Sequence, residues 1–395
     1  MAGRWIVIMA AAALIMSCGG GERDYAQLHK NSMVVDLHSD TPLRMPRGFD
    51  LAVRDTSGHM DIPRLKEGGI DLQVLACFVS TDRAADSCKS RVDQLIDSIE
   101  VQVGRNPDDI AICTTAAEAE DIINSGRIAA FIGIENGVAI ESSLDNLQHF
   151  YDRGVRYLTL THVASSDWCI SSGDTLPAFH GLTDFGRDVV RKMNELGMIV
   201  DVSHASVSAF EEALKVSTDP IIASHSCVHA ICGHDRNLTD EQLKALAANG
   251  GVIGINFFDG YLAPGNRWWE IVDSISDVHK AAIDSLEKLY EDDWSEYRTA
   301  MKPYYDMMQG MTSELGINVA TVVDHIDHIV KLVGPDYVGL GSDFDGVGDL
   351  PDGLDDCSMV PNITKELVHR GYTDEDIKKI LGGNFMRVFK RVCDK

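Results

Sequence analysis

Eight short runs of apolar, often β-branched residues recur along this chain, and each is followed by a stretch with helical character. Most of the runs are continuously apolar, as expected of parallel strands covered by helices. Eight alternating units over 395 residues favour a single (β/α)8 barrel over an open doubly wound sheet. The predicted strands are Met33–Leu37, Asp71–Val79, Ile128–Ile134, Val155–Leu160, Met198–Val202, Ile221–Ala223, Val252–Phe257 and Tyr337–Leu340.

Local signals place the boundaries of several helices. Thr239 and Gln242 have the spacing of a capping box, which predicts a helix from there to Ala248. The stretch Leu182–Leu196 is followed by Gly197, a residue typical of a helix C-terminus. Thr373 precedes three acidic residues and predicts the start of a C-terminal helix.

The segment between the seventh and eighth predicted strands, roughly Tyr261–Asn318, is much longer than one connecting helix. Its composition predicts a helical insert. Long loops that follow barrel strands lie over the active-site mouth, which favours a lid. The alternative is a peripheral helical pair that packs on the barrel or on a partner subunit.

The N-terminus has the features of an export signal. Arg4 precedes the apolar stretch Trp5–Met16, which is too short to span a bilayer. The stretch ends before Cys18 in a sequence that resembles a bacterial lipobox. We therefore expect a signal peptide over residues 1–17, a lipidated tether over 18–24 and the barrel domain over 25–395, with the protein anchored in the bacterial cell envelope. The alternative is a plain signal peptide with an incidental cysteine.

Charge and cysteine content exclude some classes of function. The net charge of −26 disfavours binding to nucleic acid, although it also simply aids solubility. Beyond Cys18, the eight remaining cysteines form no C-x-x-C pair, which argues against a thiolate metal site. Their pairing cannot be predicted from the sequence.

Six of the eight predicted strands finish in His, Asp or Glu. In a barrel the carboxyl ends of all strands meet at one mouth, where active sites lie. A single such histidine is more often a structural, hydrogen-bonded residue, but the repetition over six strands indicates a site. The residues are His38 and Asp40 after the first strand, Glu135 after the third, His162 after the fourth, His204 after the fifth, His225 after the sixth and Asp343 after the eighth.

Imidazole and carboxylate side chains without thiolates are a ligand set that suits zinc, and suits manganese or cobalt less well. His38 and Asp40 lie two residues apart, so both side chains leave an extended segment on one face and can hold one ion. His204 and His225 can hold a second ion, and Glu135 has two oxygens with which to bridge the pair. Two such ions activate a shared water as hydroxide.

Three motifs at these strand ends resemble those of the membrane (renal-type) dipeptidases, which are zinc peptidases of the amidohydrolase-like barrel group. They are RYLTLTH at 156–162, SHS at 224–226 followed by Arg236-Asn237, and GSDFDG at 341–346. The similarity extends over nearly the whole chain beyond the signal. It implies two zinc ions held by His38, Asp40, Glu135, His204 and His225, substrate contacts from His162, Arg236 and Tyr261, and a barrel-end carboxylate, Asp343, near the bridging water. By family analogy alone, a homodimer is expected.

The reaction implied is hydrolysis of small dipeptides. His162 would donate a hydrogen bond to the oxyanion, Asp343 would carry the proton to the leaving amine, and Arg236 would pair with the substrate carboxylate. Acceptance of a D-residue at the C-terminal position is left open. The alternatives are a barrel hydrolase acting on a lactone, phosphotriester or cyclic amide, a metal-dependent binding protein without turnover, and a structural lipoprotein. For Arg236 and Tyr261 individually, the alternatives are a surface arginine and a packing residue.

Overall fold

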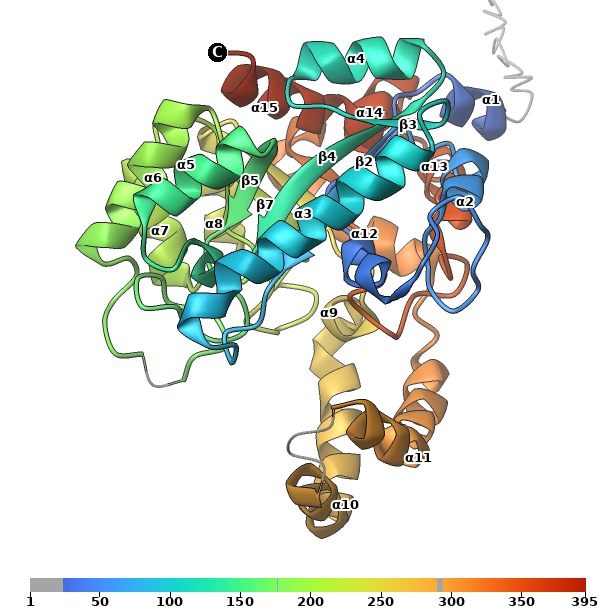
Figure 1. Ribbon diagram of the computed structural model, residues 1–395. Helices are drawn as coiled ribbons and strands as arrows, with labels where there is room; N and C mark the ends of the chain where they lie inside the picture. Colours follow the sequence, from blue (N-terminus) through green and yellow to red (C-terminus); the bar gives the residue numbers. More distant parts are fainter. Residues whose placement is uncertain (1–23, 176, 290–293) are drawn as a thin grey trace, which may run out of the picture.

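A computed structural model describes residues 24–175, 177–289 and 294–395. Eight parallel strands close into a barrel, in the order β2-β1-β9-β8-β7-β6-β5-β4 with β4 pairing back to β2 (Figure 1). The predicted barrel and each of its eight predicted strands are thereby confirmed. The strands are β1 (Val35–Asp36), β2 (Leu72–Phe78), β4 (Ile128–Glu135), β5 (Val155–Thr159), β6 (Ile199–Asp201), β7 (Ile222–Ser226), β8 (Val252–Ile255) and β9 (Val338–Leu340).

A ninth strand, β3 (Ile110–Ile112), lies beside the barrel and was not predicted. It pairs with the first residues of β4, where Ile110 is opposite Ile128. Further along the same edge, β4 pairs instead with β5, with Glu135 opposite Thr159. β3 therefore extends the sheet at the amino-terminal end of the barrel, away from the strand ends that carry the predicted site.

Helices cover the outside of the barrel (Figure 1). The capping box of Thr239 and Gln242 is present at the start of α8, and Gly197 ends α6 in the left-handed conformation. Thr373 caps α14 as predicted. The helices outside the insert are α1 (Tyr25–Lys30), α2 (Ile62–Glu67), α3 (Cys88–Arg105), α4 (Ala116–Asn124), α5 (Leu144–Asp152), α6 (Asp184–Leu196), α7 (Val207–Val216), α8 (Asp240–Ala248), α12 (Val319–Val333), α13 (Pro361–His369), α14 (Asp374–Lys378) and α15 (Asn384–Cys393).

The interior of the barrel is filled with aromatic side chains at its amino-terminal end. Phe131 of β4 packs edge-on against Phe385 and Phe389 of α15, with ring centroids 5.7 and 5.0 Å apart. Tyr157 of β5 packs on Phe131 from the side of the mouth and is fully buried. This apolar plug gives the site a rigid floor.

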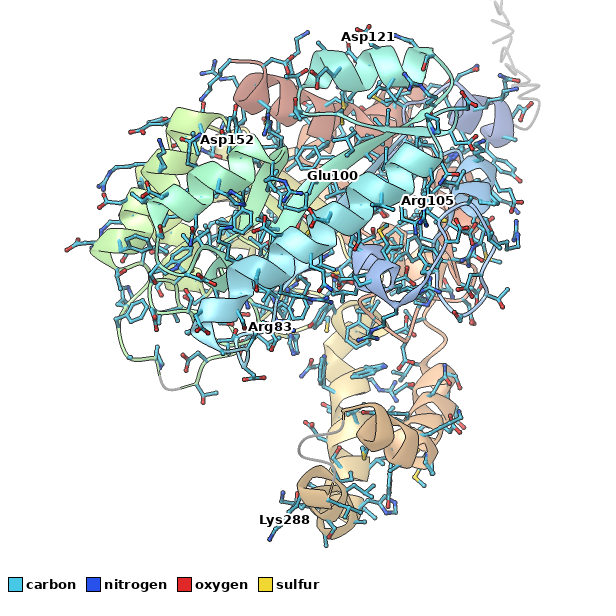
Figure 2. The ribbon with its side chains drawn as sticks, viewed as in Figure 1. Arg83, Glu100, Arg105, Asp121, Asp152 and Lys288 are labelled. Atoms are coloured by element: carbon cyan, nitrogen blue, oxygen red, sulfur yellow. The ribbon has the colours of Figure 1, made fainter. Side chains whose placement is uncertain are left out.

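The insert between β8 and β9 is helical, as predicted. It contains α9 (Asp259–Leu262), α10 (Arg267–Leu289) and α11 (Trp294–Thr312). The pair α10 and α11 projects away from the barrel as an arm (Figure 1). Lys288 lies on the outer surface at the far end of the arm (Figure 2), and Glu100 on α3 is exposed. Because the arm points away from the barrel, it does not fold over the mouth as a lid (Figure 1). Trp269, at the base of the arm, approaches the predicted site.

The predicted signal peptide and residues 18–23 of the predicted tether lie outside the described residues. The last predicted tether residue, Asp24, caps α1 by accepting a hydrogen bond from the Gln27 backbone amide. None of the described helices combines the length and the apolar character that crossing a membrane would require.

Candidate metal and substrate site

The predicted site residues meet at the carboxyl-terminal mouth of the barrel. Glu135 is the last residue of β4 and His225 lies within β7, so regular strand geometry fixes both. His204 and Asp343 lie a few residues beyond β6 and β9, with φ values of 66° and 64°. In this left-handed conformation the backbone turns sharply. His38 and Asp40 follow β1, and His162 follows β5.

Glu135 stands at the centre of four imidazoles, and its two oxygens face different groups. Oε1 lies 3.0 Å from Nε2 of His204, 3.3 Å from Nε2 of His225 and 3.6 Å from Nε2 of His162. Oε2 lies 3.7 Å from Nε2 of His38. The carboxylate thus lies between the donor atoms, and the two sides also meet, because His38, Glu135 and His225 bring ligand atoms within 4.8 Å of one another.

On the side of His38, two carboxylates complete the cluster. His38, Asp40 and Asp343 bring their ligand atoms within 4.8 Å of one another, and all three are buried. Among the described residues, Nε2 of His38 and Oδ1 of Asp40 have no hydrogen-bond partner. Buried polar atoms without partners are costly, so these atoms fit a bound cation.

A second set lies on the other side of Glu135. Nε2 of His204 and Nε2 of His225 are 2.9 Å apart. Glu135, His162 and His204 form another group with ligand atoms within 4.8 Å. Two imidazole nitrogens this close point to a shared proton or a shared cation. Imidazoles and carboxylates are ligands typical of zinc sites.

The protonation of most of the cluster fits cation binding; His38 differs, because burial would lower its pKa but the charge of Glu135 raises it well above its usual range. Burial alone would raise the pKa of Glu135, but the nearby His162 and His38 hold that pKa well below its usual range. Burial lowers the pKa of His204 and His225, which favours the neutral imidazole that metals require. Burial and the charge of Glu135 raise the pKa of Asp40 to about 7. A cation would relieve this repulsion between carboxylates.

Asp343 is held by a residue that the sequence analysis missed. Asn256 directly follows β8 and donates a hydrogen bond from Nδ2 to Oδ2 of Asp343 at 2.8 Å. Its Oδ1 accepts a hydrogen bond from the Phe258 backbone amide. The predicted strand Val252–Phe257 includes Asn256, and an amide side chain within a strand does not by itself indicate a catalytic or metal-binding residue.

Arg236 and Tyr261 line a cavity of about 350 Å³ beside the cluster. Arg236 is 6% exposed, so the alternative of a surface arginine is wrong. Its Nη2 donates to the carbonyl oxygen of His225 at 2.9 Å, and its guanidinium lies over the Tyr261 ring. Its Nε is buried and has no partner in the described part of the chain. Trp269, at the base of the arm, completes this wall of the cavity.

Two buried carboxylates, Asp36 and Asp201, support the mouth from below. Asp36 ends β1 and accepts hydrogen bonds from Gln73 of β2 and from the hydroxyl of Ser342 after β9. Asp201 ends β6 and accepts hydrogen bonds from the hydroxyls of Thr159 on β5 and Ser224 on β7. Each carboxylate ties together three neighbouring strands immediately before the residues of the cluster.

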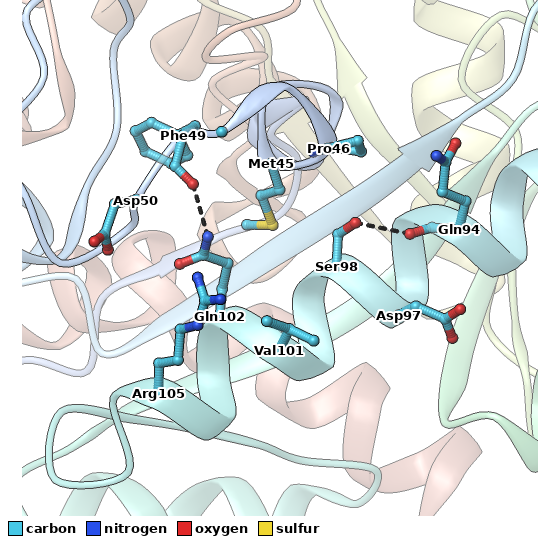
Figure 3. A pocket seen from close by; sticks show the side chains of 11 residues that line it. Met45, Pro46, Phe49, Asp50, Gln94, Asp97, Ser98, Val101, Gln102 and Arg105 are labelled. Atoms are coloured by element: carbon cyan, nitrogen blue, oxygen red, sulfur yellow. Dashed lines mark hydrogen bonds between the residues drawn. The ribbon is translucent and has the colours of Figure 1, made fainter.

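A further cavity of about 470 Å³ lies between α3 and the 3-10 turn Met45–Arg47 (Figure 3). At its wall Gln102 donates a hydrogen bond to the Phe49 carbonyl oxygen. Its lining contains Asp50, Asp97 and Arg105 and none of the predicted site residues. Its lining residues include no histidine or cysteine, so they give no indication of catalysis.

A parallel barrel with buried histidines and carboxylates at its mouth defines a metal-dependent barrel hydrolase. The chain belongs to the membrane dipeptidase family, peptidase family M19, whose sequence model matches residues 22–394. The family resemblance noted in the sequence is thereby confirmed. Dipeptidase 3 of Mus musculus is 31% identical over 378 residues, which cover 92% of this chain and 65% of the mouse protein. Dipeptidase 3 of Homo sapiens is 30% identical over 375 residues, with 92% and 66% covered. The chain spans just under two thirds of the length of these relatives.

Solved structures share the fold. The probable dipeptidase PvdM from Pseudomonas aeruginosa superposes with a TM-score of 0.81 and 28% identity, covering 94% of this chain and 98% of that chain. Dipeptidase AC, a metallopeptidase of family M19, gives a TM-score of 0.74 at 25% identity, with 92% and 99% covered. A metallopeptidase from Rhodobacter sphaeroides, liganded with a phosphinate mimic of the dipeptide L-Ala-D-Ala, gives 0.73 at 24%, with 91% and 99% covered.

Proposed function

We propose that this protein is a zinc-dependent dipeptidase that uses two metal ions. The observation that carries the proposal is the position of Glu135, whose Oε2 approaches His38 and whose Oε1 approaches His204 and His225. His38 and Asp40 would hold one ion, His204 and His225 the other, and Glu135 would bridge them. The ions, when bound, would activate a water and polarise the scissile carbonyl.

The protein's own side chains would perform the remaining steps. Burial lowers the pKa of His162, whose Nε2 lies 3.6 Å from Glu135, and this favours a neutral imidazole that would donate one hydrogen bond to an oxyanion. Asp343, held by Asn256, would accept the proton of the attacking water and deliver it to the leaving amine. Both groups face the cluster from strands on opposite sides of the mouth.

Arg236 would determine the length of the substrate. Two of its nitrogens are engaged by the His225 carbonyl and the Ser226 hydroxyl, which fixes the guanidinium at the cavity wall. Its free Nε leaves a donor for a carboxylate. A cationic group beside the metal cluster suits a C-terminal carboxylate one residue from the scissile bond, and therefore a dipeptide.

The stereochemistry of the second residue is part of the proposal. The Rhodobacter sphaeroides structure holds a mimic of L-Ala-D-Ala, and fragments of the bacterial cell wall would supply such dipeptides in the envelope. We therefore propose that a D-residue is accepted at the C-terminal position.

The test combines metal analysis with a substrate screen. We expect about two zinc equivalents per chain and hydrolysis of L,L and L,D dipeptides, with little activity on tripeptides or on a lactone and a phosphotriester. Full activity of metal-free protein would contradict the proposal, as would faster turnover of the lactone or phosphotriester. Hydrolysis of L,L dipeptides alone would overturn only the proposed stereochemistry.

We further propose that lipidated Cys18 anchors the enzyme in the bacterial cell envelope, facing the periplasm, and that the enzyme is a homodimer. The apolar stretch Trp5–Met16 and the sequence before Cys18 support the anchor. Replacement C18S should release an active, folded enzyme from membranes, as measured by fractionation. Unchanged membrane association of C18S would show that Cys18 is not the anchor. Light scattering of the released protein tests the dimer.

A further inference from the structure

Asp201 is a fully buried carboxylate with a complete set of hydrogen-bond donors. Its Oδ1 accepts from the backbone amides of Ser203 and Ser224 at 3.1 and 2.8 Å. Its Oδ2 accepts from the hydroxyls of Thr159 and Ser224 at 2.6 and 2.7 Å. A buried carboxylate with four donors remains an acceptor on both oxygens.

The hydroxyl of Ser224 joins this carboxylate to His225. Ser224 Oγ lies 2.7 Å from Nδ1 of His225. Because the serine proton is donated to Asp201, the oxygen of Ser224 is left to accept a hydrogen bond from His225. Nδ1 of His225 must therefore carry the ring proton, and Nε2 must present its lone pair. That Nε2 is the atom that faces Glu135 and His204.

We infer that Asp201 and Ser224 are positioning residues that act through His225, as a carboxylate–hydroxyl–imidazole relay that fixes its tautomer and increases its basicity toward a metal ion. Supports of this kind beneath a ligand histidine typically contribute a factor of about 10–100 in metal affinity. The inference rests on the proposed metal site. It names two residues that determine how strongly one of the two ions is bound.

The relay distinguishes His225 from the other imidazoles of the cluster. Nδ1 of His204 is buried and finds no partner among the residues that the structure describes. Nδ1 of His38 lies 2.9 Å from the Tyr157 hydroxyl, which itself lies 3.5 Å from the Leu37 carbonyl oxygen, so its hydrogen-bond chain leads to a backbone carbonyl. The ion held by His204 and His225 therefore depends on Asp201 and Ser224, and the ion held by His38 does not.

Two variants separate the relay from a merely structural role of Asp201. S224A removes the hydroxyl between Asp201 and His225. T159V removes the other hydroxyl that donates to Oδ2 of Asp201, with nearly the same shape and no contact with a cluster histidine. The probe is zinc alone, titrated stepwise into metal-free protein against a competing chelator. The unfolding temperature of the metal-free protein is measured in parallel.

We expect S224A to bind one of its two zinc ions about 10–100-fold more weakly than wild type and the other unchanged. T159V should bind both as wild type does, even if both variants unfold at a somewhat lower temperature. Equal zinc affinities in S224A and wild type would overturn the inference, as would equal losses in S224A and T159V. S224C, which keeps the size of the side chain but has a weaker hydrogen-bonding group, repeats the test if S224A does not fold. A wild-type protein that binds no zinc would instead overturn the proposed function.

Discussion

Asn256 donates a hydrogen bond to Asp343 across the mouth of the barrel, from Nδ2 to Oδ2 at 2.8 Å. Both residues are buried, and the second oxygen of Asp343 is left facing Asp40 and His38. The amide therefore sets which oxygen of the proposed proton carrier faces the reacting atoms.

The variant N256D should test this relationship. It keeps an oxygen for the Phe258 amide but sets a second carboxylate against Asp343, which raises the apparent pKa of the pair. Loss of a charge-assisted hydrogen bond of roughly 1.5–3 kcal/mol predicts that kcat/KM falls by about 10–100-fold. The acidic limb of the pH–rate profile should move to higher pH. An unmoved profile would show that Asn256 does not position Asp343.

Gly346 should tolerate no side chain. A Cβ on this residue would overlap Oδ2 of Asp40 and Oδ1 of Asp343. We expect G346A to displace these carboxylates, with a loss of bound zinc and at least about 100-fold lower kcat/KM, as for misplaced catalytic groups. G348A is the matched control, because a Cβ on Gly348 meets no atom within 4 Å. The measurements are the zinc content and kcat/KM of both variants. Equal values for G346A and G348A would contradict the steric argument.

The barrel could be predicted because its strands are buried on both faces and read as continuous apolar runs. The list of strand-end residues followed from the same topology, since parallel strands bring their carboxyl ends together. β3 could not be predicted because a three-residue strand beside the barrel has no periodicity of its own. The direction of the arm could not be predicted either, because helical patterns give lengths and faces but not the angle at which a hairpin leaves a barrel.

The residues that support the cluster are harder to predict from the sequence than the members of the cluster. Tyr157 and Ser224 lie within motifs that the sequence analysis quoted, but their roles depend on which neighbour each hydroxyl meets. Asp36 and Asp201 end strands as the cluster residues do, yet they point below the mouth, where they bind neighbouring strands. Each supporting carboxylate precedes a cluster histidine by only two or three residues, and all of these polar side chains are buried. The sequence alone therefore could not separate ligand from support.

Arg236 should select for a free carboxylate. Lysine cannot contact the His225 carbonyl, the Ser226 hydroxyl and a substrate at once, because it lacks the planar set of five donors. We expect R236K to lower kcat/KM for a dipeptide by about 10–100-fold, as for loss of one charge-assisted pair. The loss should be much smaller for the same dipeptide with an amidated C-terminus. Zinc content checks that His225 is undisturbed. Additive penalties in this double-mutant cycle would show that Arg236 does not read the carboxylate.

His325 should make the stability of the fold depend on pH, independently of the active site. It lies buried in α12, where Nδ1 accepts a hydrogen bond from the Val228 amide and Nε2 faces the Leu262 carbonyl oxygen. Burial lowers its pKa to about 4, whereas an unfolded histidine titrates near pH 6.5. Between these values the unfolded chain binds the additional proton, so the free energy of unfolding falls as the pH drops from about 6.5 to 4, by up to roughly 3 kcal/mol from this residue.

H325N keeps an acceptor for Val228 and cannot be protonated, so its unfolding free energy should change less over this range. H369N, which replaces an exposed histidine, is the control. Chemical denaturation of the metal-free proteins at several pH values measures the slopes, and parallel slopes for wild type and H325N would contradict the assignment.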